Sequence, residues 1–516
     1  MTLIGWLQFF LIVQGVHFLG TWKLYQKAGR KSWEAIIPIH NAIVLMQIIN
    51  RPKWWVILLF IPVINLLMFP VIWVETARSF GKNSTKDTWL SFLTVGLYIY
   101  YLNYMLDVKH VKDRDLKSKS ELGEWVSSII FAIVAATLVH TYIMQPYTIP
   151  TSSLEKSLLV GDFLFVSKFH YGARTPLTPI AAPMVHDTLP IIGIKSYLKK
   201  PSLPYFRIPG FQKIKRNDIV VFNWPTDTVQ QFFKTPDRKI VKPIDKKSNY
   251  VKRCVAIAGD SLEIKDGIIY INGKESKMPE RCKTQYFYNV DTNGQSLSEN
   301  SLYNRYHIRP GEAYMTRDGK YRLNLDEENA QKLKNNPIVK SIERLIAPKG
   351  KAANVFPSIK MNWNTDNFGP IYIPKKGKTI ALTLESLPLY RRIINVYEHH
   401  QLEIKNNSIY IDGKITNRYT FKQNYYWMMG DNRHNSEDAR YWGYVPFDHV
   451  VGKPVFVWFS WDSYGKGLKK IRWERLFTTV NGEGPIKSYF YHFIGFLVLY
   501  FGIKKYRKKR KEKRTL

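Results

Sequence analysis

The chain has 516 residues, 45% of them apolar, which is enough for about three domains and a large buried core. Its formal net charge of +35 indicates an acidic partner, which can be nucleic acid, a membrane surface or an acidic ligand. No nucleic-acid recognition motif accompanies the charge, so we do not expect a DNA- or RNA-binding protein.

The N-terminal region is rich in uncharged apolar segments. Four segments lack Asp, Glu, Lys and Arg, and each is about long enough to cross roughly 30 Å of hydrocarbon. They are residues 1–22, 54–74, 88–106 and 125–146. No basic residue precedes Lys23, so the first segment does not have the pattern of a cleavable signal peptide. We therefore predict a multi-span α-helical membrane region over 1–124 and a membrane anchor helix at 125–146.

The basic residues of the connecting loops predict the orientation. Residues 23–53 carry six Lys and Arg, residues 76–87 carry three, and residues 107–124 carry five. Because positive loops stay in the cytoplasm, the first and third loops are predicted there. The chain then leaves the membrane near Pro146 for the extracytoplasmic side, where a large domain follows.

The outer domain is predicted to be mostly β. Short apolar runs such as "NDIVVFNW" and "KPVFVWFSW" are bounded by Gly, Pro, Asn and Asp, as is typical of strands and turns. The hairpin pattern of residues 261–274 recurs at 401–414. The recurrence is either a coincidence between two generic hairpins, a local duplication, or one hairpin split by an insertion. Between the two hairpins lies a polar block, 277–398, whose role the sequence does not indicate.

The C-terminus ends in a second candidate membrane segment. Residues 488–503 are uncharged but short for a span, so an interfacial helix is the alternative. The basic tail 504–516 follows directly and is typical of a segment that faces anionic cytoplasmic lipid.

Two adjacent serines, Ser152 and Ser153, follow the anchor helix. A serine hydroxyl needs a nearby base to become a nucleophile, and a lysine can serve when burial favours its neutral amine. Strand alternation in 249–260 places Lys252 on one face with Cys254 and small residues. Lowering its pKa to the useful 7 to 8 needs on the order of 4 kcal/mol of desolvation. On spacing alone, a lysine that snorkels from a strand is the alternative.

A third stretch, 425–446, is dense in paired charges and side-chain acceptors. The run "GDNRHNSEDAR" combines Gly, Asp, Asn, Arg and Ser within one loop, which favours a rigid polar network. An Asx-rich turn or a cation loop is the alternative, but the spacing does not fit an EF-hand.

Together these stretches resemble the bacterial type I signal peptidases, the leader peptidase family. "IPTSS", "LLVGDFLFVSKFHYG", "RNDIVVFNWP", "YVKRCVAIAGD" and "GDNRHNSEDARYWG" occur in the family's order, over about 144–280 and 420–460. The resemblance implies a hydrolase of the serine protease class with a Ser-Lys dyad. Together with the predicted spans and loop charges, it indicates a multi-pass protein of the cytoplasmic (inner) membrane whose catalytic domain faces the periplasm. That domain would have two parts, 147–276 and 399–480, separated by the insertion.

The resemblance assigns roles residue by residue. The family's nucleophile is the second serine of a Pro-x-x-Ser pattern, which matches Ser153, although the spacing leaves Ser152 open. Lys252 matches the general base, and Thr151 matches the hydroxyl that joins the Ser153 N–H in the oxyanion hole. The supporting residues are the lysine-orienting Ser436 and the ion pair of Asp438 with Arg440.

The chain departs from the family pattern at several positions. The family usually has Met after the nucleophile and Pro two residues later, whereas this chain has Leu154, Glu155 and Lys156. His434 stands where Asp is frequent, and Ala439 where Ser is frequent. The four predicted spans also exceed the one or two that are common in the family.

The implied function is the removal of N-terminal signal peptides from secreted preproteins during translocation. The substrate would carry small residues at the first and third positions before the cut, and it would bind extended beside an enzyme strand. The lipid bilayer is the other expected partner; no metal, organic cofactor or nucleic acid is expected, and the oligomeric state is left open.

Two other classes of protein fit the sequence less well. A non-catalytic, membrane-anchored binding or scaffold protein would have no need of Ser153, Lys252 and Ser436 together. A self-cleaving repressor would be soluble and carry a DNA-binding module, and the sequence indicates neither. The two cysteines, Cys254 and Cys282, could pair in an oxidising compartment, but we favour a small buried thiol at Cys254.

Overall fold

The computed structural model describes residues 3–116, 121–229 and 240–515. The chain folds as two compact units, which we describe separately. The first unit comprises Met1–Ile143, Ala173–Ile208 and Pro243–Lys246, and the second comprises Met144–Gly172, Pro209–Lys242 and Lys247–Leu516. The first unit is helical, and the second contains all strands described below.

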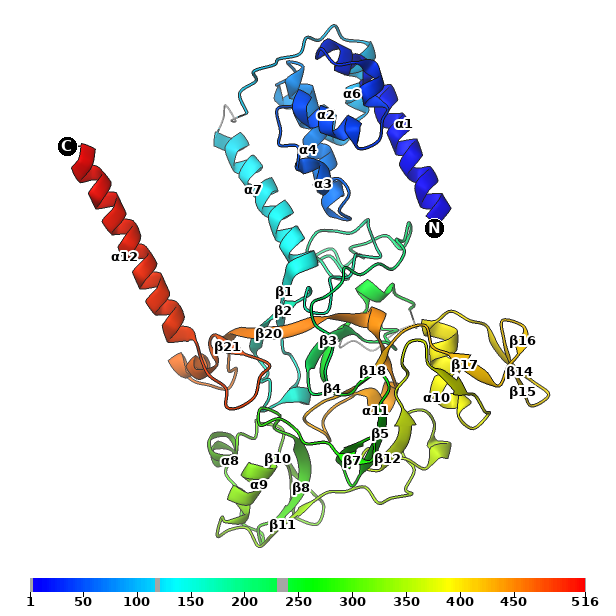
Figure 1. Ribbon diagram of the computed structural model, residues 1–516. Helices are drawn as coiled ribbons and strands as arrows, with labels where there is room; N and C mark the ends of the chain where they lie inside the picture. Colours follow the sequence, from blue (N-terminus) through cyan, green and yellow to red (C-terminus); the bar gives the residue numbers. More distant parts are fainter. Residues whose placement is uncertain (1–2, 117–120, 230–239, 516) are drawn as a thin grey trace. The chain divides into compact units, whose positions relative to one another are not determined.

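Seven α-helices form most of the first unit (Figure 1). They are α1 (Leu3–Lys27), α2 (His40–Ile48), α3 (Trp55–Leu58), α4 (Ile64–Ser79), α5 (Thr85–Leu93), α6 (Leu97–Tyr104) and α7 (Glu121–Leu138). Helices α1 and α6 pack against each other, and Leu24, Ile72 and Leu102 contribute to a shared apolar core. Val134 of α7 packs on Leu58, Ile64 and Met68 of α3 and α4.

Two of the predicted spans are not continuous helices, which corrects the sequence analysis. Segment 54–74 divides into α3 and α4 around Pro62, whose ring removes a backbone donor. Segment 88–106 divides into α5 and α6 at Gly96, where φ is 85°. A Cβ at Gly96 would lie 2.7 Å from the Trp73 ring, so only glycine fits this break. The average hydropathy of a segment does not reveal such backbone breaks.

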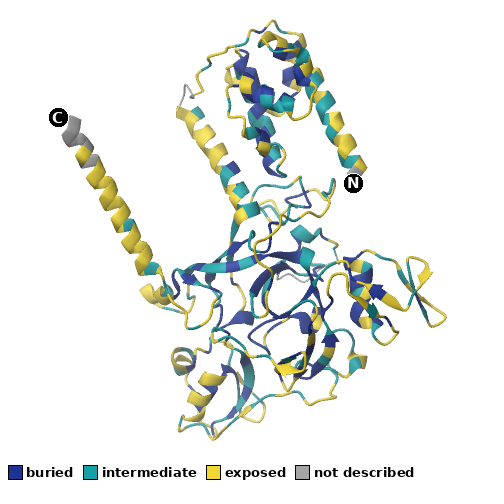
Figure 2. Ribbon diagram, viewed as in Figure 1, coloured by how far each residue is buried: buried dark blue, intermediate teal, exposed yellow. Residues whose placement is uncertain are grey.

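In the described part of the chain, two helices are long and apolar enough to cross a membrane. These are Ile4–Lys27 and Glu121–Ile143, which overlap the predicted segments 1–22 and 125–146. The second includes α7 and the π-helical turn Val139–Ile143. Figure 2 shows α7 largely exposed, and its outward side chains include Trp125, Ile129 and Phe131. Exposed apolar side chains in such numbers are typical of an interaction site or of contact with lipid.

The second unit is built on an antiparallel sheet, as the predicted mostly-β domain requires. The strand order is β1-β2-β20-β3-β4-β18-β19, and β21 pairs with β20. The bounds are β1 Met144–Thr148, β2 Asp162–Ser167, β3 Ile219–Asn223, β4 Asn249–Ala256, β18 Tyr425–Met429, β19 Val445–Pro446, β20 Val450–Ser460 and β21 Thr478–Thr479. Every residue of β3 and β18 is buried, so both strands lie inside the core.

The predicted insertion 277–398 contains a small α+β module with its own core. Its sheet has the order β11-β8-β10-β9, and two short helices accompany it. The bounds are β8 Gln285–Asp291, α8 Glu299–Tyr306, β9 Tyr314–Met315, β10 Tyr321–Asp326, α9 Glu327–Lys334 and β11 Ser341–Arg344. Val290, Leu302, Leu323 and Leu333 are almost fully buried within it. We call residues 285–344 the inserted module.

The remaining strands form three small sheets. Strands β5 Ser261–Lys265, β6 Ile268–Ile271, β7 Lys274–Glu275 and β12 Phe368–Tyr372 form one, and β13 Thr379–Ala381 pairs with β17 Arg418–Thr420. The third contains β14 Leu402–Lys405, β15 Ser408–Ile411 and β16 Lys414–Ile415. The two similar sequence stretches adopt the same hairpin register, with Leu262 opposite Ile271 and Leu402 opposite Ile411.

The remaining α-helices of the described chain are the short α10 Leu387–Arg392 and α11 Ala439–Trp442 and the long C-terminal α12 Phe490–Thr515. Helix α12 begins within the predicted segment 488–503 and continues through the basic tail. It is not among the described helices that qualify as a span. Cys254 and Cys282 are both free and buried, so the alternative of a disulfide is not realised.

Candidate active site

Ser153 lies in a single 3-10 turn, Ser152–Leu154, shortly after β1. Leu154 and Leu158 are buried in the apolar core beneath the turn, and the Leu158 N–H donates to the Leu154 carbonyl over 2.7 Å. Ser153 itself is only 8% exposed. The turn therefore holds a serine hydroxyl in a largely dehydrated position.

Lys252 comes from β4, far from β1 in the strand order. Neighbouring strands are about 4.8 Å apart, so a flat sheet would separate β1 and β4 by about 19 Å. Instead, the Lys252 Nζ lies 2.5 Å from the Ser153 Oγ. The five residues from Ile149 to Ser153, which follow β1, can cover most of that distance, because an extended chain advances about 3.3 Å per residue.

Burial controls the charge of Lys252. The side chain is almost fully buried, and desolvation lowers its pKa to about 8, against the opposing effect of the Asp438 and Glu437 carboxylates. Its ammonium lies 5.3 Å from the centre of the Tyr250 ring, on the same face of the strand. A lysine with a pKa near 8 has a substantial neutral fraction at neutral pH, and only the neutral amine can accept a proton from Ser153.

The loop that follows β18 encloses the serine turn. Strand β18 pairs with β4, and Met429 lies opposite Arg253, so the loop begins beside the lysine strand. The Asn432 N–H donates to the Ser153 carbonyl over 3.1 Å, and its side-chain amide donates to the Ser152 carbonyl over 3.1 Å. No role was predicted for Asn432, although its place in the "GDN" motif after a buried strand is a signal for one.

Ser152 has a different environment from Ser153. The Asn435 side-chain amide donates to the Ser152 Oγ over 2.9 Å. The structure thus pairs Lys252 with Ser153 and pairs Ser152 with a loop asparagine. Asn435 is a second contact residue to which the sequence analysis gave no role.

Ser436 lies against the backbone of the serine turn. A Cβ at Gly430 would come within 2.3 Å of the Ser436 Oγ and 2.5 Å of the Ser153 carbonyl oxygen, so all three are in close contact. The Ser436 Oγ is buried, and in the described residues it has no hydrogen-bond partner. The structure therefore brings Ser436 to the site but does not link it to Lys252 by a hydrogen bond.

Asp438 and Arg440 form a buried ion pair. The Arg440 Nη2 lies 2.8 Å from Asp438 Oδ2, and its Nε donates to Oδ1 over 2.9 Å. Asp438 also accepts from the Gly430 N–H and caps α11. Burial alone would raise the pKa of Asp438, but the Arg440 guanidinium keeps this pKa below its ordinary value. The hydrogen bond from Gly430 to Asp438 joins the start of the loop to its end, where the ion pair lies.

A second buried ion pair was not identified from the sequence. Arg253, the neighbour of Lys252 on β4, donates to both carboxylate oxygens of Asp431, over 2.7 and 2.6 Å. The Arg253 side chain points to the opposite face of β4 from Lys252. A bidentate pair of this kind holds strand and loop in a defined orientation.

Thr151 is exposed and occupies the capping position before the 3-10 turn, but its side chain makes no capping hydrogen bond. Its predicted oxyanion role stays a prediction. The fold and the geometry of Ser153 with Lys252 define a candidate serine hydrolase with a lysine base.

Comparison with known families identifies the class. Residues 122–322 and 395–461, more than half of the chain, match the family model "Signal peptidase, peptidase S26". The chain belongs to this signal peptidase family. The matched residues include Ser153, Lys252 and the loop 430–440. In the helical unit, residues 33–113 match a model described as "Family of unknown function (DUF5684)".

Individual proteins that are similar to this chain carry the name of the same family. The chain is 26% identical over 372 residues to "Signal peptidase I" of Buchnera aphidicola subsp. Acyrthosiphon pisum, which covers 70% of this chain and 85% of the relative. It is 25% identical over 375 residues to "Signal peptidase I" of Helicobacter pylori, covering 70% and 92%. For "Signal peptidase I" of Haemophilus influenzae the identity is 23% over 374 residues, covering 70% and 76%.

Proposed function

We propose that this protein is a membrane-bound serine endopeptidase that removes N-terminal signal peptides from secreted preproteins. The observation that carries the proposal is the 2.5 Å contact between the Ser153 hydroxyl and the buried Lys252 amine, within a chain of the signal peptidase family. In this proposal Ser153 is the nucleophile and Lys252 is the general base.

The reaction proceeds in two halves. Neutral Lys252 accepts the Ser153 proton as the Oγ attacks the scissile carbonyl, and the ammonium then protonates the leaving amine. The Ser153 N–H and the Thr151 hydroxyl stabilise the tetrahedral oxyanion. Water activated by Lys252 hydrolyses the resulting acyl-enzyme and regenerates the serine. Ser436, which lies beside the serine turn, orients the Lys252 amine when the substrate is bound.

The substrate binds as an extended strand with small residues at its first and third positions before the cut. Strand β1 leads into the serine turn and stands at the end of the strand order, paired with β2. Its other edge carries backbone groups that can pair with an extended peptide. A signal peptide added there would present its scissile bond close to Ser153.

The enzyme is proposed to be a multi-pass protein of the cytoplasmic membrane with its catalytic unit on the periplasmic side. The first and third loops between the predicted spans carry the most Lys and Arg, which favours the cytoplasm for these two loops. An even number of spans, two or four, places Met144 and the following residues outside. In the first unit, Ile191, Ile192, Ile194 and Leu198 are exposed and suit contact with the bilayer surface.

The direct test is cleavage of a purified preprotein by the full chain in detergent or in reconstituted vesicles. We expect a single cut after an Ala-x-Ala site, and loss of that cut when the last alanine of the site is replaced by a bulky residue. N-terminal sequencing of the product locates the cut. If the wild-type chain binds the preprotein but leaves it intact, a non-catalytic anchored binding protein becomes the better description.

The activity is expected to depend on the protonation of Lys252. Protonated Lys252 cannot accept the serine proton, so kcat/KM should rise about tenfold per pH unit below about pH 8 and level off above it. At pH 6 the expected kcat/KM is about 100-fold below the plateau. The measurement is kcat/KM for one preprotein across this range.

Lys247 provides a matched control for the pH profile. Burial also lowers its pKa to about 8, with Arg392 as the next cause, but its ammonium contacts the Pro225 carbonyl and His449 instead of a serine. Lys247→Gln should therefore leave the acidic limb unchanged. If the acidic limb moves or vanishes in Lys247→Gln, the titrating group is Lys247 and not Lys252.

A further inference from the structure

The inserted module and the short segment after it contact the active site at three of the positions where this chain departs from the family pattern. On the nucleophile side these are Glu155 and Lys156. The Lys156 Nζ donates to the Tyr306 carbonyl over 3.0 Å and to the His307 carbonyl over 2.6 Å. Arg309, from the same module, lies 4.0 Å from the Glu155 carboxylate.

The backbone at this contact is unusual for the residues that occupy it. Lys156 has φ of 69°, in the left-handed region that lysine seldom adopts, three residues after Ser153. His307, at the C-terminal end of α8, has φ of 53°. The lysine ammonium thus binds the carbonyl groups where α8 ends, which is a favourable place for a cation. These hydrogen bonds hold the end of the serine segment in a conformation that it would not favour alone.

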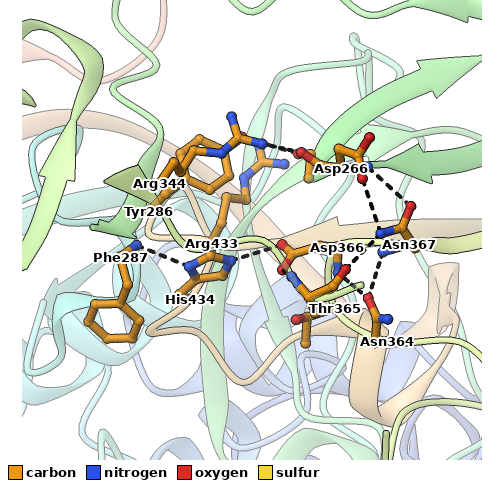
Figure 3. A network of polar contacts seen from close by, with 12 residues as sticks. Asp266, Tyr286, Phe287, Arg344, Asn364, Thr365, Asp366, Asn367, Arg433 and His434 are labelled. Atoms are coloured by element: carbon orange, nitrogen blue, oxygen red, sulfur yellow. Dashed lines mark hydrogen bonds and ion pairs between the residues drawn. The ribbon is translucent and has the colours of Figure 1, made fainter. Parts of the chain in front are cut away.

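On the loop side the third of these positions is His434. Its Nδ1 accepts from the Phe287 N–H over 3.0 Å, so the ring carries its proton on Nε2 and donates to Asp366 Oδ1 over 2.8 Å. Figure 3 shows the histidine between Phe287 of β8 and the turn that contains Asp366. That turn is fixed in its own right, because the other oxygen of Asp366 accepts from the Ala347 N–H.

A third set of contacts reaches the serine turn through one asparagine. Asn324 of β10 donates to the Asn432 Oδ1 over 2.6 Å, and Asn432 in turn donates to the carbonyls of Ser152 and Ser153. The backbone of Gln285 exchanges hydrogen bonds with Asp431 and Arg433, each over 2.9 Å. The start of β8 is therefore joined to the loop that covers the nucleophile.

We infer that the inserted module acts as a clamp, which holds the Ser153 turn and the 430–436 loop in the relative positions that catalysis needs. Its positioning residues are Lys156, Asn324 and His434. The module has its own core, so it can act as a rigid support. Catalysis requires the nucleophile and base to stay within about 0.5 Å of their productive geometry. The inference rests on the proposed function, and it gives the insertion a role in the chemical step.

Lys156→Met is the first test, because it keeps most of the side-chain stem and removes the donors. We expect kcat for preprotein cleavage to fall about tenfold or more while KM changes less than about twofold, since positioning of Ser153 and not substrate binding is lost. Lys156→Arg, which can still donate to both carbonyls, should recover most of kcat. Lys332→Met is the matched control, since Lys332 lies in the same module and pairs with the exposed Glu328.

Asn324→Leu tests the clamp from its other side and covers the case in which Lys156→Met fails to fold. It should lower kcat by a similar factor, with melting temperature and near-UV circular dichroism showing that the protein is folded. Equal kcat per folded molecule in wild type, Lys156→Met and Asn324→Leu would overturn the inference. A parallel rise in KM with unchanged kcat would overturn it too, because the module would then serve binding.

A second readout separates this inference from the proposed function. The rate at which a fluorophosphonate phosphonylates Ser153, with fluoride as the leaving group, depends on the dyad geometry but not on recognition of a preprotein. If the wild type is phosphonylated without cutting preproteins, the proposed function fails while slower phosphonylation of Lys156→Met still supports the clamp. If the wild type cuts preproteins and both variants are phosphonylated at its rate, the clamp alone fails.

Discussion

Ser153→Ala and Lys252→Met are each expected to lower kcat for preprotein cleavage by about 10⁴-fold or more. Either change removes one partner of the 2.5 Å contact, and the remaining partner cannot supply both the nucleophile and the proton transfer. Lys252→Arg should be as inactive as Lys252→Met, because a guanidinium stays protonated and cannot act as a base. The measurement is single-turnover cleavage in detergent, with folding checked by thermal melting.

Ser152→Ala is the matched control for this experiment. The Ser152 hydroxyl accepts a hydrogen bond from Asn435, and its loss should change kcat only severalfold. The reverse pattern, with Ser152→Ala inactive and Ser153→Ala active, would move the nucleophile by one residue. Full activity of both Ser153→Ala and Lys252→Met would remove the basis for a serine–lysine mechanism.

Arg440→Met is expected to destabilise the catalytic unit by about 3–5 kcal/mol. The substitution leaves the Asp438 carboxylate buried without its cation, and uncompensated buried charges cost about this much. It also removes the hydrogen bonds from Arg440 to the Thr365 and Arg433 carbonyls. The free energy of unfolding of the detergent-solubilised protein, obtained from denaturant titration, measures the effect.

The same variant should shift the pH profile in a defined direction. The positive charge of Arg440 helps to lower the pKa of Lys252, while Asp438 raises it. Without Arg440 the acidic limb of kcat/KM should therefore move to higher pH. Asp438→Asn combined with Arg440→Met should recover part of the lost stability, because the charge is removed together with its partner.

An exposed ion pair provides the control for Arg440→Met. Lys405 and Glu403 pair on the surface of the β14–β15 hairpin, with more than half of each side chain exposed. Lys405→Met should leave both stability and the pH profile unchanged, because solvent screens such pairs. Equal effects of Arg440→Met and Lys405→Met would show that burial of the Asp438–Arg440 pair has no special importance.

Local sequence signals predicted the mostly-β second unit and the family correctly. Alternating apolar residues bounded by turn formers are local, so "NDIVVFNW" and "YVKRCVAIA" could be assigned to strands without any knowledge of their partners. The two hairpins at 261–274 and 401–414 were likewise predictable, since Asn-Gly and Asp-Gly turns specify them over a few residues. The first and last N-terminal segments were recognised by length and hydropathy alone.

The helical breaks at Pro62 and Gly96 were not predicted, because a window of average hydropathy contains no information about φ at one residue. The close approach of the Trp73 ring to Gly96 exists only in the folded unit. The roles of Asn432 and Asn435 were missed for a related reason. An asparagine in a turn is common, and only the folded loop places its amide against the carbonyl or hydroxyl of another segment.

The strands of the second unit, the two long apolar helices, the family and the residue types available for catalysis could be predicted from the sequence, because these depend on local pattern and on motif order. Which serine contacts Lys252 is visible only in the folded protein, since Ser153 and Lys252 are 99 residues apart in the chain. The tertiary structure also decided that Lys156 and His434 contact the inserted module. Hydrogen bonds between segments 150 residues apart depend on how the chain packs, and no local pattern specifies them.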